Sequence, residues 1–373
     1  MDGQRPEATG VHVSEADAQR QGITQMTGLE AETRLAYARF GEREARGNSP
    51  LYEEVSGAIA RDDTLLARIE TLPAAKRQPN LVLGAARFLG APDDDAGTFV
   101  TWLTQHWGEV EAVARERATQ TNEAGRCATL LPFVAEAARG RPVALVEVGC
   151  SAGLALFPDL YSYRFRTSGG EIVVGDGSPE LVTTVTGEGV ESRALPADIP
   201  QVAWRGGLDL NPLDVLSDSA KARDNARWLE ALVWPGQTTR AERLRGCIAT
   251  VRGHLGTHPG ERPVVVRGDV VDDLDELLRQ VPDELPLVLF HSAVLAYTDE
   301  ATRAEFADRM REIASRPGGF TWISNEGPGV MPGIAETVPE GVEVPAGRFV
   351  LAVDGVARAL VGPHGQAIEF LAG

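Results

Sequence analysis

The chain has 373 residues, of which 43% are hydrophobic and 24% are charged, as in a soluble globular protein that can bury a sizeable core. It carries 36 Lys and Arg against 54 Asp and Glu, and the formal net charge of -18 disfavours nucleic acids and anionic membranes as partners. Three widely spaced cysteines form neither a disulfide framework nor a zinc pattern, which predicts a reducing, cytoplasmic environment. The longest apolar run, Leu285 to Tyr297, is too short to span a membrane, and no signal segment is predicted.

The N-terminal third is predicted to be helical. Residues 1–24 are polar and aperiodic, which predicts a mobile tail. Residues 25–140 carry apolar side chains at three- and four-residue spacing and no alternating segment, so we expect an all-helical cap domain. The expected helices are Ala31–Phe40, Tyr52–Ile59, Leu65–Leu72, Leu81–Leu89, Phe99–Trp107 and Val110–Ala118.

Residues 141–373 alternate between strand and helix patterns, which predicts an α/β domain with a doubly wound, mostly parallel sheet. A small β-meander is expected as an insertion at about residues 160–200, and a hairpin closes the chain. The expected strands outside the meander are Ala144–Val148, Ala203–Leu208, Val264–Arg267, Leu287–Phe290, Phe320–Ser324, Arg348–Val353, Ala357–Leu360 and Ile368–Leu371. The expected helices are Asn225–Leu232, Ala241–Val251, Leu274–Val281 and Ala301–Ile313.

The most informative stretch opens at Pro142 and reads V-A-L-V-E-V-G-C-S-A-G. A buried strand that runs into small residues predicts a tight turn, where a ligand can approach the backbone closely. We expect a helix after this turn, whose first N–H groups would face an anionic or polar ligand. Glu147 stands at the carboxyl end of the strand, two residues before Gly149.

Later strands also end in polar residues. The second ends at Asp209, where a carboxylate can accept hydrogen bonds from both hydroxyls of a ribose. The third ends at Asp269, which could accept from an adenine amino group, and the fourth runs into His291. Ligands of open α/β sheets bind outside the carboxyl ends of the strands, so these residues predict one site at that edge.

The chain resembles the class I S-adenosylmethionine-dependent methyltransferases. The resemblance is carried by four motifs in this order: E-V-G-C-S-A-G, G-L-D-L-N-P, R-G-D-V and V-L-F-H-S-A-V-L-A-Y-T-D-E. The resemblance covers about residues 143–373 and implies a seven-stranded-type Rossmann-like sheet, S-adenosylmethionine as cofactor, and methyl transfer to a small-molecule acceptor. More narrowly, the chain from about residue 52 is similar to the bacterial domain-of-unknown-function family 2332. That similarity is carried by Arg77–Asn80, Thr119–Glu123, Gly207–Asp214 and Phe290–Tyr297.

The resemblance implies a role for each matching residue. Glu147 would bind the methionine amino group, Asp209 the ribose hydroxyls, and Asp269 with its neighbour Val270 the adenine. His291 and the residue after it would form the floor near the sulfonium. The other cofactor-binding residues implied are Gly149, Cys150, Ser151, Gly153, Leu210 and Ser292.

The polar segment Thr119–Arg126, just ahead of the first strand, is predicted to fold over the cofactor. Arg126 could pair bidentately with the methionine carboxylate. If the acceptor must lose a proton, His291 and Glu123 are the candidate bases. The residues expected to face the substrate are Asn122, Tyr297, Asn325 and Glu326.

Two positions depart from the expected pattern. Ser151 stands where the family has a glycine, and Asp209 follows Gly153 by 56 residues instead of the ~20 usual for a ribose acid. Spacing alone would predict Glu171 or Asp176 as the ribose acid. We prefer Asp209 because of the strand end that surrounds it.

The glycine turn also reads G-x-S-x-G, the nucleophile elbow of α/β-hydrolases. Ser151 would be the nucleophile, with Asp269 or Asp354 as the acid and His364 as the base. The helical pattern upstream of the strand counts against this alternative. A third alternative is a cofactor-binding regulatory module without turnover.

A metal site is not predicted. His254 and His258 have the spacing of a metal pair, but Gly253 and Gly256 disfavour a helix there, and no third ligand is evident.

Overall fold

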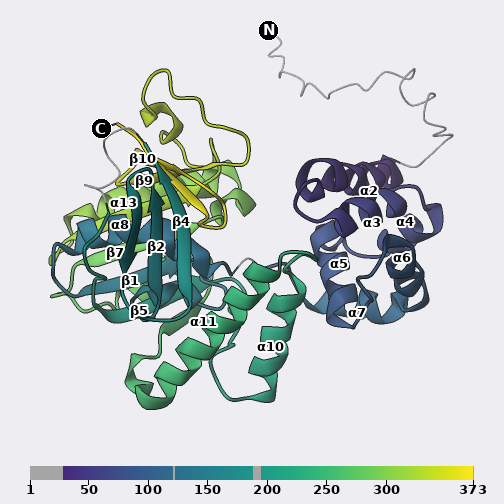
Figure 1. Ribbon diagram of the computed structural model, residues 1–373, viewed down its shortest axis with the longest axis horizontal. Helices are drawn as coiled ribbons and strands as arrows, with labels where there is room; N and C mark the ends of the chain where they lie inside the picture. The colour runs from purple at the N-terminus through teal and green to yellow at the C-terminus, as the bar shows by residue number, and fades with distance from the viewer. Residues whose placement is uncertain (1–27, 121, 188–194, 373) are drawn as a thin grey trace, which may run out of the picture. The chain divides into compact units, whose positions relative to one another are not determined.

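The computed structural model describes residues 28–120, 122–187 and 195–372, and the predicted tail, residues 1–24, lies outside them. The chain forms two compact units (Figure 1). The first extends to Thr119 and includes Trp234–Gly236, and the second comprises Gln120–Val233 and Gln237–Gly373. None of the helices in the described residues combines the length and the apolar composition that crossing a membrane requires.

The described part of the first unit is helical, as its periodicity predicts. Side-chain caps at Ser49, Asp62 and Asp95 accept hydrogen bonds from the N–H groups that begin three of its helices. Trp234 packs its ring 5.1 Å from that of Phe40. The helices are α2 (Gly28–Arg39), α3 (Pro50–Ile59), α4 (Asp63–Ile69), α5 (Pro79–Phe88), α6 (Ala96–Gln105) and α7 (Trp107–Glu116).

Helix α8 (Cys127–Ala138) was expected in the helical domain but belongs to the second unit. Nearly every residue of α8 is buried, and Leu131 and Phe133 share one core with the strand residues Leu145 and Phe290. Periodicity identifies a helix, but it does not show which core the helix joins.

The second unit is built on one mixed, mostly parallel sheet of eleven strands, in the order β3-β2-β4-β11-β10-β9-β8-β7-β1-β5-β6. The α/β prediction is confirmed, whereas the sheet is wider than the seven-stranded type. The strands are β1 (Val143–Val148), β2 (Ser162–Thr167), β3 (Gly170–Val174), β4 (Glu180–Thr186), β5 (Val202–Asp209), β6 (Val264–Arg267), β7 (Leu287–Ser292), β8 (Phe320–Glu326), β9 (Phe349–Val353), β10 (Val356–Val361) and β11 (Ala367–Phe370).

Strand β1 lies in the middle of five parallel strands, β6-β5-β1-β7-β8. Its register sets Glu147 beside Gly207 of β5 on one side and Phe290 of β7 on the other. The chain leaves β1, β5, β7 and β8 at the same edge, because parallel strands share one direction. Polar residues at these four strand ends therefore converge.

Helices cover both faces of this sheet, and each strand buries alternate residues on each face. The core on one face contains Leu145 and Phe290, and the core on the other contains Val146 and Leu289. Helices α8 and α11 contribute to the first core, and α12 and α13 to the second. The crossover helices are α10 (Ala220–Ala231), α11 (Thr238–Thr257), α12 (Leu274–Leu278) and α13 (Glu300–Glu312).

The helix expected after the glycine turn is absent. The chain instead makes two short 3-10 turns, Leu154–Leu156 and Pro158–Leu160, and enters β2. Side chains bond the carbonyls that a helix would have used: the Tyr161 hydroxyl donates to Leu154 O at 2.8 Å, and Arg205 Nη1 to Leu156 O at 2.9 Å. The turn is therefore not followed by a helix dipole.

The expected meander is an extension of the main sheet. A meander would pair β3 with both of its neighbours, but β2 pairs in parallel with β4 and leaves β3 at the sheet's edge. Strand β4 then pairs in parallel with β11. Tyr163, Phe165 and Leu181 enter the same core as β1, so burial of apolar side chains joins the insertion to the sheet.

Arg205 is expected to be critical for the second unit, because it is buried and bonds Asp159 through Nη2 at 2.7 Å as well as Leu156 O. Replacing Arg205 with Ala leaves the buried Leu156 carbonyl and the partly buried Asp159 carboxylate without this donor, which costs about 3 kcal/mol. Urea unfolding should show a lower midpoint. The matched control is Arg223→Ala, whose exposed pair with Asp218 contributes less than about 1 kcal/mol. Equal losses in the two variants would contradict the prediction.

Candidate functional site

The turn after β1 has a left-handed backbone at Gly149, Ser151 and Gly153, with φ of 76°, 50° and 68°. Ser151 therefore holds a conformation that favours glycine. A Cβ on Gly149 would lie 2.5 Å from Cγ2 of Val294, so the loop after β7 rests directly on this turn. Only glycine fits at position 149.

Asp209, the predicted ribose acid, closes the same turn from the end of β5. Its Oδ2 accepts from the N–H of Ser151 at 2.8 Å, and its Oδ1 accepts from the N–H of Asn211 at 2.7 Å. The alternatives Glu171 and Asp176 follow from spacing alone and lie in and just after β3, at the far edge of the sheet. Of the three acids, Asp209 is the one beside the glycine turn.

Glu147, next to the last residue of β1, is a buried carboxyl to which no described residue donates a hydrogen bond. Its Oε2 is enclosed and has no hydrogen-bond partner. Burial raises the pKa of Glu147 well above its ordinary value, an effect that Arg126 opposes and Asp209 reinforces. Burial thus disfavours the charged form of this carboxyl, and a cation beside it would oppose that effect.

Arg126 lies on the 3-10 turn Ala124–Arg126, just ahead of α8. Its Nε donates to Pro363 O at 2.8 Å, and its Nη1 donates to Ser292 O at 2.8 Å. Both acceptors are backbone carbonyls, and Arg126 forms no ion pair with Glu147. Among the described residues, Nη2 of Arg126 has no hydrogen-bond partner.

These two side chains line one small pocket at the carboxyl edge between β1 and β7. The pocket has a volume of about 10 Å³, room for a single water molecule. Six of the residues predicted for the site line it. Its lining residues are Asn122, Glu123, Arg126, Leu130, Glu147, Gly149, Ala155, Phe290 and Ser292.

His291 does not line the pocket, because it follows Phe290 and points to the opposite face of β7. It is fully buried, stacks on Trp322, and bonds Glu326 from Nδ1 to Oε1 at 2.9 Å. The same Oε1 accepts from the N–H groups of Val294 and Leu295. Glu326, predicted to face the substrate, therefore holds the loop after β7.

The remaining predicted residues occupy varied environments. Asn325 is buried and donates to the Ser292 hydroxyl at 2.9 Å, and Asn122 donates to Cys150 O at 3.2 Å. Tyr297 is 77% exposed.

The turn after β6 is closed by Asp269, which accepts from the N–H of Val271 at 2.8 Å. Val270 is buried in the core of the opposite face, whereas Leu210 is 66% exposed. Val270, predicted to contact the adenine, therefore lies in the core on the opposite face from Leu130 and Phe290, which line the pocket.

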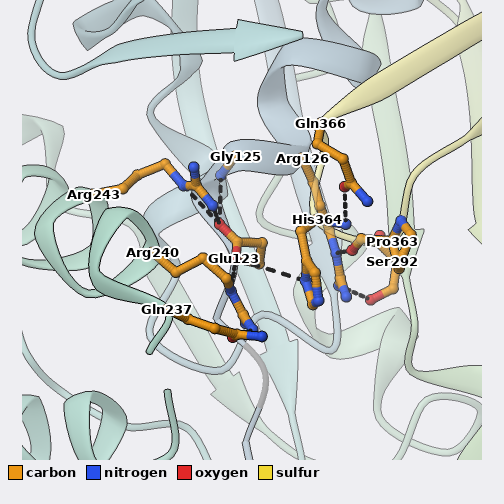
Figure 2. A network of polar contacts seen from close by, with 10 residues as sticks. All are labelled: Glu123, Gly125, Arg126, Gln237, Arg240, Arg243, Ser292, Pro363, His364 and Gln366. Carbon is orange, nitrogen blue, oxygen red and sulfur yellow. Dashed lines mark hydrogen bonds and ion pairs between the residues drawn. The ribbon is translucent and has the colours of Figure 1, made fainter. Parts of the chain in front are cut away.

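Glu123 is the centre of a network that the sequence did not reveal (Figure 2). Its Oε2 accepts from Arg240 Nε at 2.7 Å, and its Oε1 accepts from Arg243 Nε at 2.9 Å. Burial raises the pKa of Glu123, but the two guanidiniums outweigh burial and hold it below its ordinary value. Both oxygens are engaged, which makes Glu123 a poor candidate for the base.

Arg240 and Arg243 come from α11, and their three-residue spacing, which puts them on one helix face, is the only signal in the sequence. His364 comes from the turn between β10 and β11, and its Nδ1 lies 3.7 Å from Glu123 Oε2. Burial and the nearby Arg240 lower the pKa of His364 to about 4, so it is neutral at pH 7.

The hydrolase alternative requires contacts that the described residues do not make. Ser151 Oγ is buried and has no hydrogen-bond partner. Asp354 accepts from the N–H of Trp322, near the amino end of β8, whereas His364 lies beside Glu123. The elbow's helix is also absent.

His254 and His258 lie at the end of α11, which continues to Thr257 despite its glycines. Their rings stack, and His254 bonds Glu261 at 2.8 Å.

Glu147→Gln is expected to stabilise the protein at alkaline pH. Because the pKa of Glu147 is raised by folding, its carboxyl destabilises the fold as pH rises above the unfolded value of about 4.3. Glutamine keeps the shape of the protonated form, so Tm at pH 8 should rise by about 2 °C, and the difference should shrink toward pH 4. Glu136→Gln, exposed on α8, is the matched control with little effect. A lower Tm for Glu147→Gln at pH 8 would mean that the carboxylate is ionised and paired.

The chain matches the protein family described as "Uncharacterized protein conserved in bacteria (DUF2332)" over residues 34–370. No curated protein matches it. The match spans most of the helical unit and nearly all of the sheet unit. The chain therefore belongs to the bacterial family DUF2332.

Proposed function

We propose that the protein binds S-adenosylmethionine at the carboxyl edge of its sheet and transfers the methyl group to a small-molecule acceptor. The observation that carries the proposal is the presence in one pocket of two ionisable groups that have no ion-pair partner among the described residues. Glu147 and Arg126 line the same pocket but are not paired with each other. An α-amino acid group has an ammonium that could bind Glu147 and a carboxylate that could bind Arg126.

The topology supports a nucleotide-like ligand in this place. Numbered along the chain, the parallel strands β6-β5-β1-β7-β8 have the order 3-2-1-4-5, which is that of doubly wound nucleotide-binding sheets. Such sheets bind their ligands where the strand order reverses, here between β1 and β7. The pocket with Glu147 and Arg126 lies at that point.

Asp209 fits the role of the ribose acid. Each of its oxygens accepts one backbone N–H, and a carboxylate oxygen has a second lone pair with which to accept from a ribose hydroxyl. The exposed side chain of Leu210 follows directly and offers an apolar surface for the adenine. Asp269 lies just after β6, the neighbour of β5, where its carboxylate could accept a hydrogen bond from the adenine amino group.

Binding requires the pocket to open, because its present volume is that of one water. The loop after β7 is the part we expect to move. Val294 rests on Gly149, and Ala293 holds a left-handed φ of 56° that moving the loop would relax. Glu326 accepts hydrogen bonds from two N–H groups of the loop, and breaking them would contribute to the free energy that opening requires.

The cofactor supplies an activated methyl group on a sulfonium, so the chain's task is to orient the acceptor and exclude water. Arg126 and Glu147 would orient the amino-acid end, and Ser292 would border the reacting centre. His291 lies on the other face and Glu123 is engaged by two arginines, so neither is placed to accept a proton from the acceptor. This favours an acceptor atom that needs no strong base, and it also favours the second candidate, a binding module without turnover.

Calorimetric titration of the full chain with S-adenosylmethionine and with S-adenosylhomocysteine tests the proposal. We expect binding with a Kd in the micromolar range, weakened at least thirtyfold by Glu147→Ala, because truncating a buried charge partner costs about 2 kcal/mol or more. Glu136→Ala, exposed on the neighbouring helix α8, is the matched control and should bind like the parent.

Absence of heat at near-millimolar ligand would refute the cofactor assignment. Binding that Glu147→Ala leaves unchanged would refute the site. If both ligands bind equally well and no labelled methyl reaches any small-molecule acceptor, the module without turnover is the better description.

A further inference from the structure

The network around Glu123 has more positive than negative charge. Arg240 and Arg243 share this one carboxylate as their ion-pair partner. Arg126 lies nearby and interacts with both Glu123 and Arg240 electrostatically. The hydrogen-bond acceptors of Arg126 are the carbonyls of Pro363 and Ser292, and it forms no ion pair with Glu147 in the same pocket. A cationic centre of this kind is notable in a chain with a net charge of -18.

The two arginines retain donors that nothing in the described residues uses. Arg240 donates Nε to Glu123 and Nη1 to Gln237, which leaves Nη2. Arg243 directs Nε and Nη2 at Glu123 Oε1, which leaves Nη1. The side chains are 21% and 18% exposed, and neither free nitrogen is enclosed. These donors are thus open to a ligand.

Glu123 also fixes the two guanidiniums before any ligand arrives. Side chains that are already ordered lose less entropy on binding, so such donors bind an anion more tightly than mobile surface arginines do. Figure 2 shows Arg240 and Arg243 meeting at Glu123, with His364 on its other side. His364 is neutral, one third exposed, and adds a polar ring to the same cluster.

The cluster is joined tightly to the pocket. Glu123, which binds both arginines, is itself a lining residue of the pocket. The turn that carries His364 presses on the segment after Glu123, because a Cβ on Gly365 would lie 1.9 Å from Gly125 O. A group held by the arginines would therefore lie next to a ligand in the pocket.

We propose that Arg240, Arg243 and His364 form an anion subsite that binds the carboxylate or phosphate of the methyl acceptor. The assignment of this anion to an acceptor rests on the proposed function, whereas anion binding itself does not. An anion subsite beside the pocket narrows the class of methyl acceptor to small anionic molecules. An anion bound here also offsets the positive charge beside His364 and makes that imidazole a stronger base.

Calorimetry of the full chain with succinate and, separately, with inorganic phosphate tests the subsite at constant ionic strength and without cofactor. We expect saturable binding in the millimolar range, weakened at least tenfold by Arg240→Gln. Arg245→Gln is the matched control, since Arg245 lies on the same helix and pairs with Glu230 at 2.9 Å, away from the cluster. Tighter binding of succinate would identify the anion as a carboxylate, and tighter binding of phosphate as a phosphate.

A second measurement needs no variant of the arginines. In the NMR spectrum of histidine-labelled protein, the His364 signal, identified by its loss in His364→Asn, should not titrate between pH 5.5 and 7.5. Saturating anion should bring its titration into that range. If Arg240→Gln fails to fold, Arg240→Lys and this titration replace it.

The proposal is overturned if neither anion binds saturably, or if Arg240→Gln and Arg245→Gln bind alike and the His364 titration is insensitive to anions. Because no cofactor is present, these results are independent of whether S-adenosylmethionine binds.

Discussion

The candidate site depends on the two hydrogen bonds by which Arg126 joins three distant parts of the chain. Its guanidinium bonds carbonyls that are 166 and 237 residues away, at the end of β7 and in the turn between β10 and β11. Neutral acceptors hold the side chain in place but leave its charge without a direct partner. The low-dielectric surroundings then make that charge a strong attraction for an anionic group. The same contacts bring the C-terminal turn, with His364, to the edge of the pocket.

Two buried glutamates beside Arg126 show how the surroundings decide the state of a carboxyl. Glu123 has two guanidiniums on its oxygens, and they lower its pKa despite burial. Glu147 has no hydrogen-bond partner, and burial raises its pKa. Glu123 thus holds the cationic cluster together, whereas Glu147 has no cation bonded to it. The proposed ligand would meet Glu147 and Arg126, which line one pocket, and not Glu123, whose two oxygens are already engaged by arginines.

Successive side chains of a β-strand point to opposite faces, which explains why neighbouring residues at the end of β7 have different roles. Phe290 and Ser292 face the pocket, and His291 between them faces the opposite core, where it bonds Glu326. That pair positions the loop whose Val294 rests on the glycine turn. The effect of His291 on the pocket is therefore transmitted through the backbone.

The sequence by itself determined the elements with a local cause. Apolar spacing of three and four residues located the helices, short apolar runs located the strands, and the glycines at 149 and 153 predicted the turn. The order of polar strand ends was enough to bring Glu147, Asp209 and Ser292 to one edge, because parallel strands share a direction. The elements and the turn depend on residues close together in the chain, and the shared edge follows from the alternation of strands and helices, which predicts parallel strands.

Only the tertiary structure decided what depends on contacts between distant segments. It assigned α8 to the sheet's core, paired β2 with β4, replaced the expected helix with 3-10 turns, and turned His291 away from the pocket. It also gathered Arg240, Arg243 and His364 around Glu123 across separations of 117 and 120 residues for the two arginines. An ion pair between such distant residues leaves no periodic trace in a single sequence, since it is set by how the elements pack.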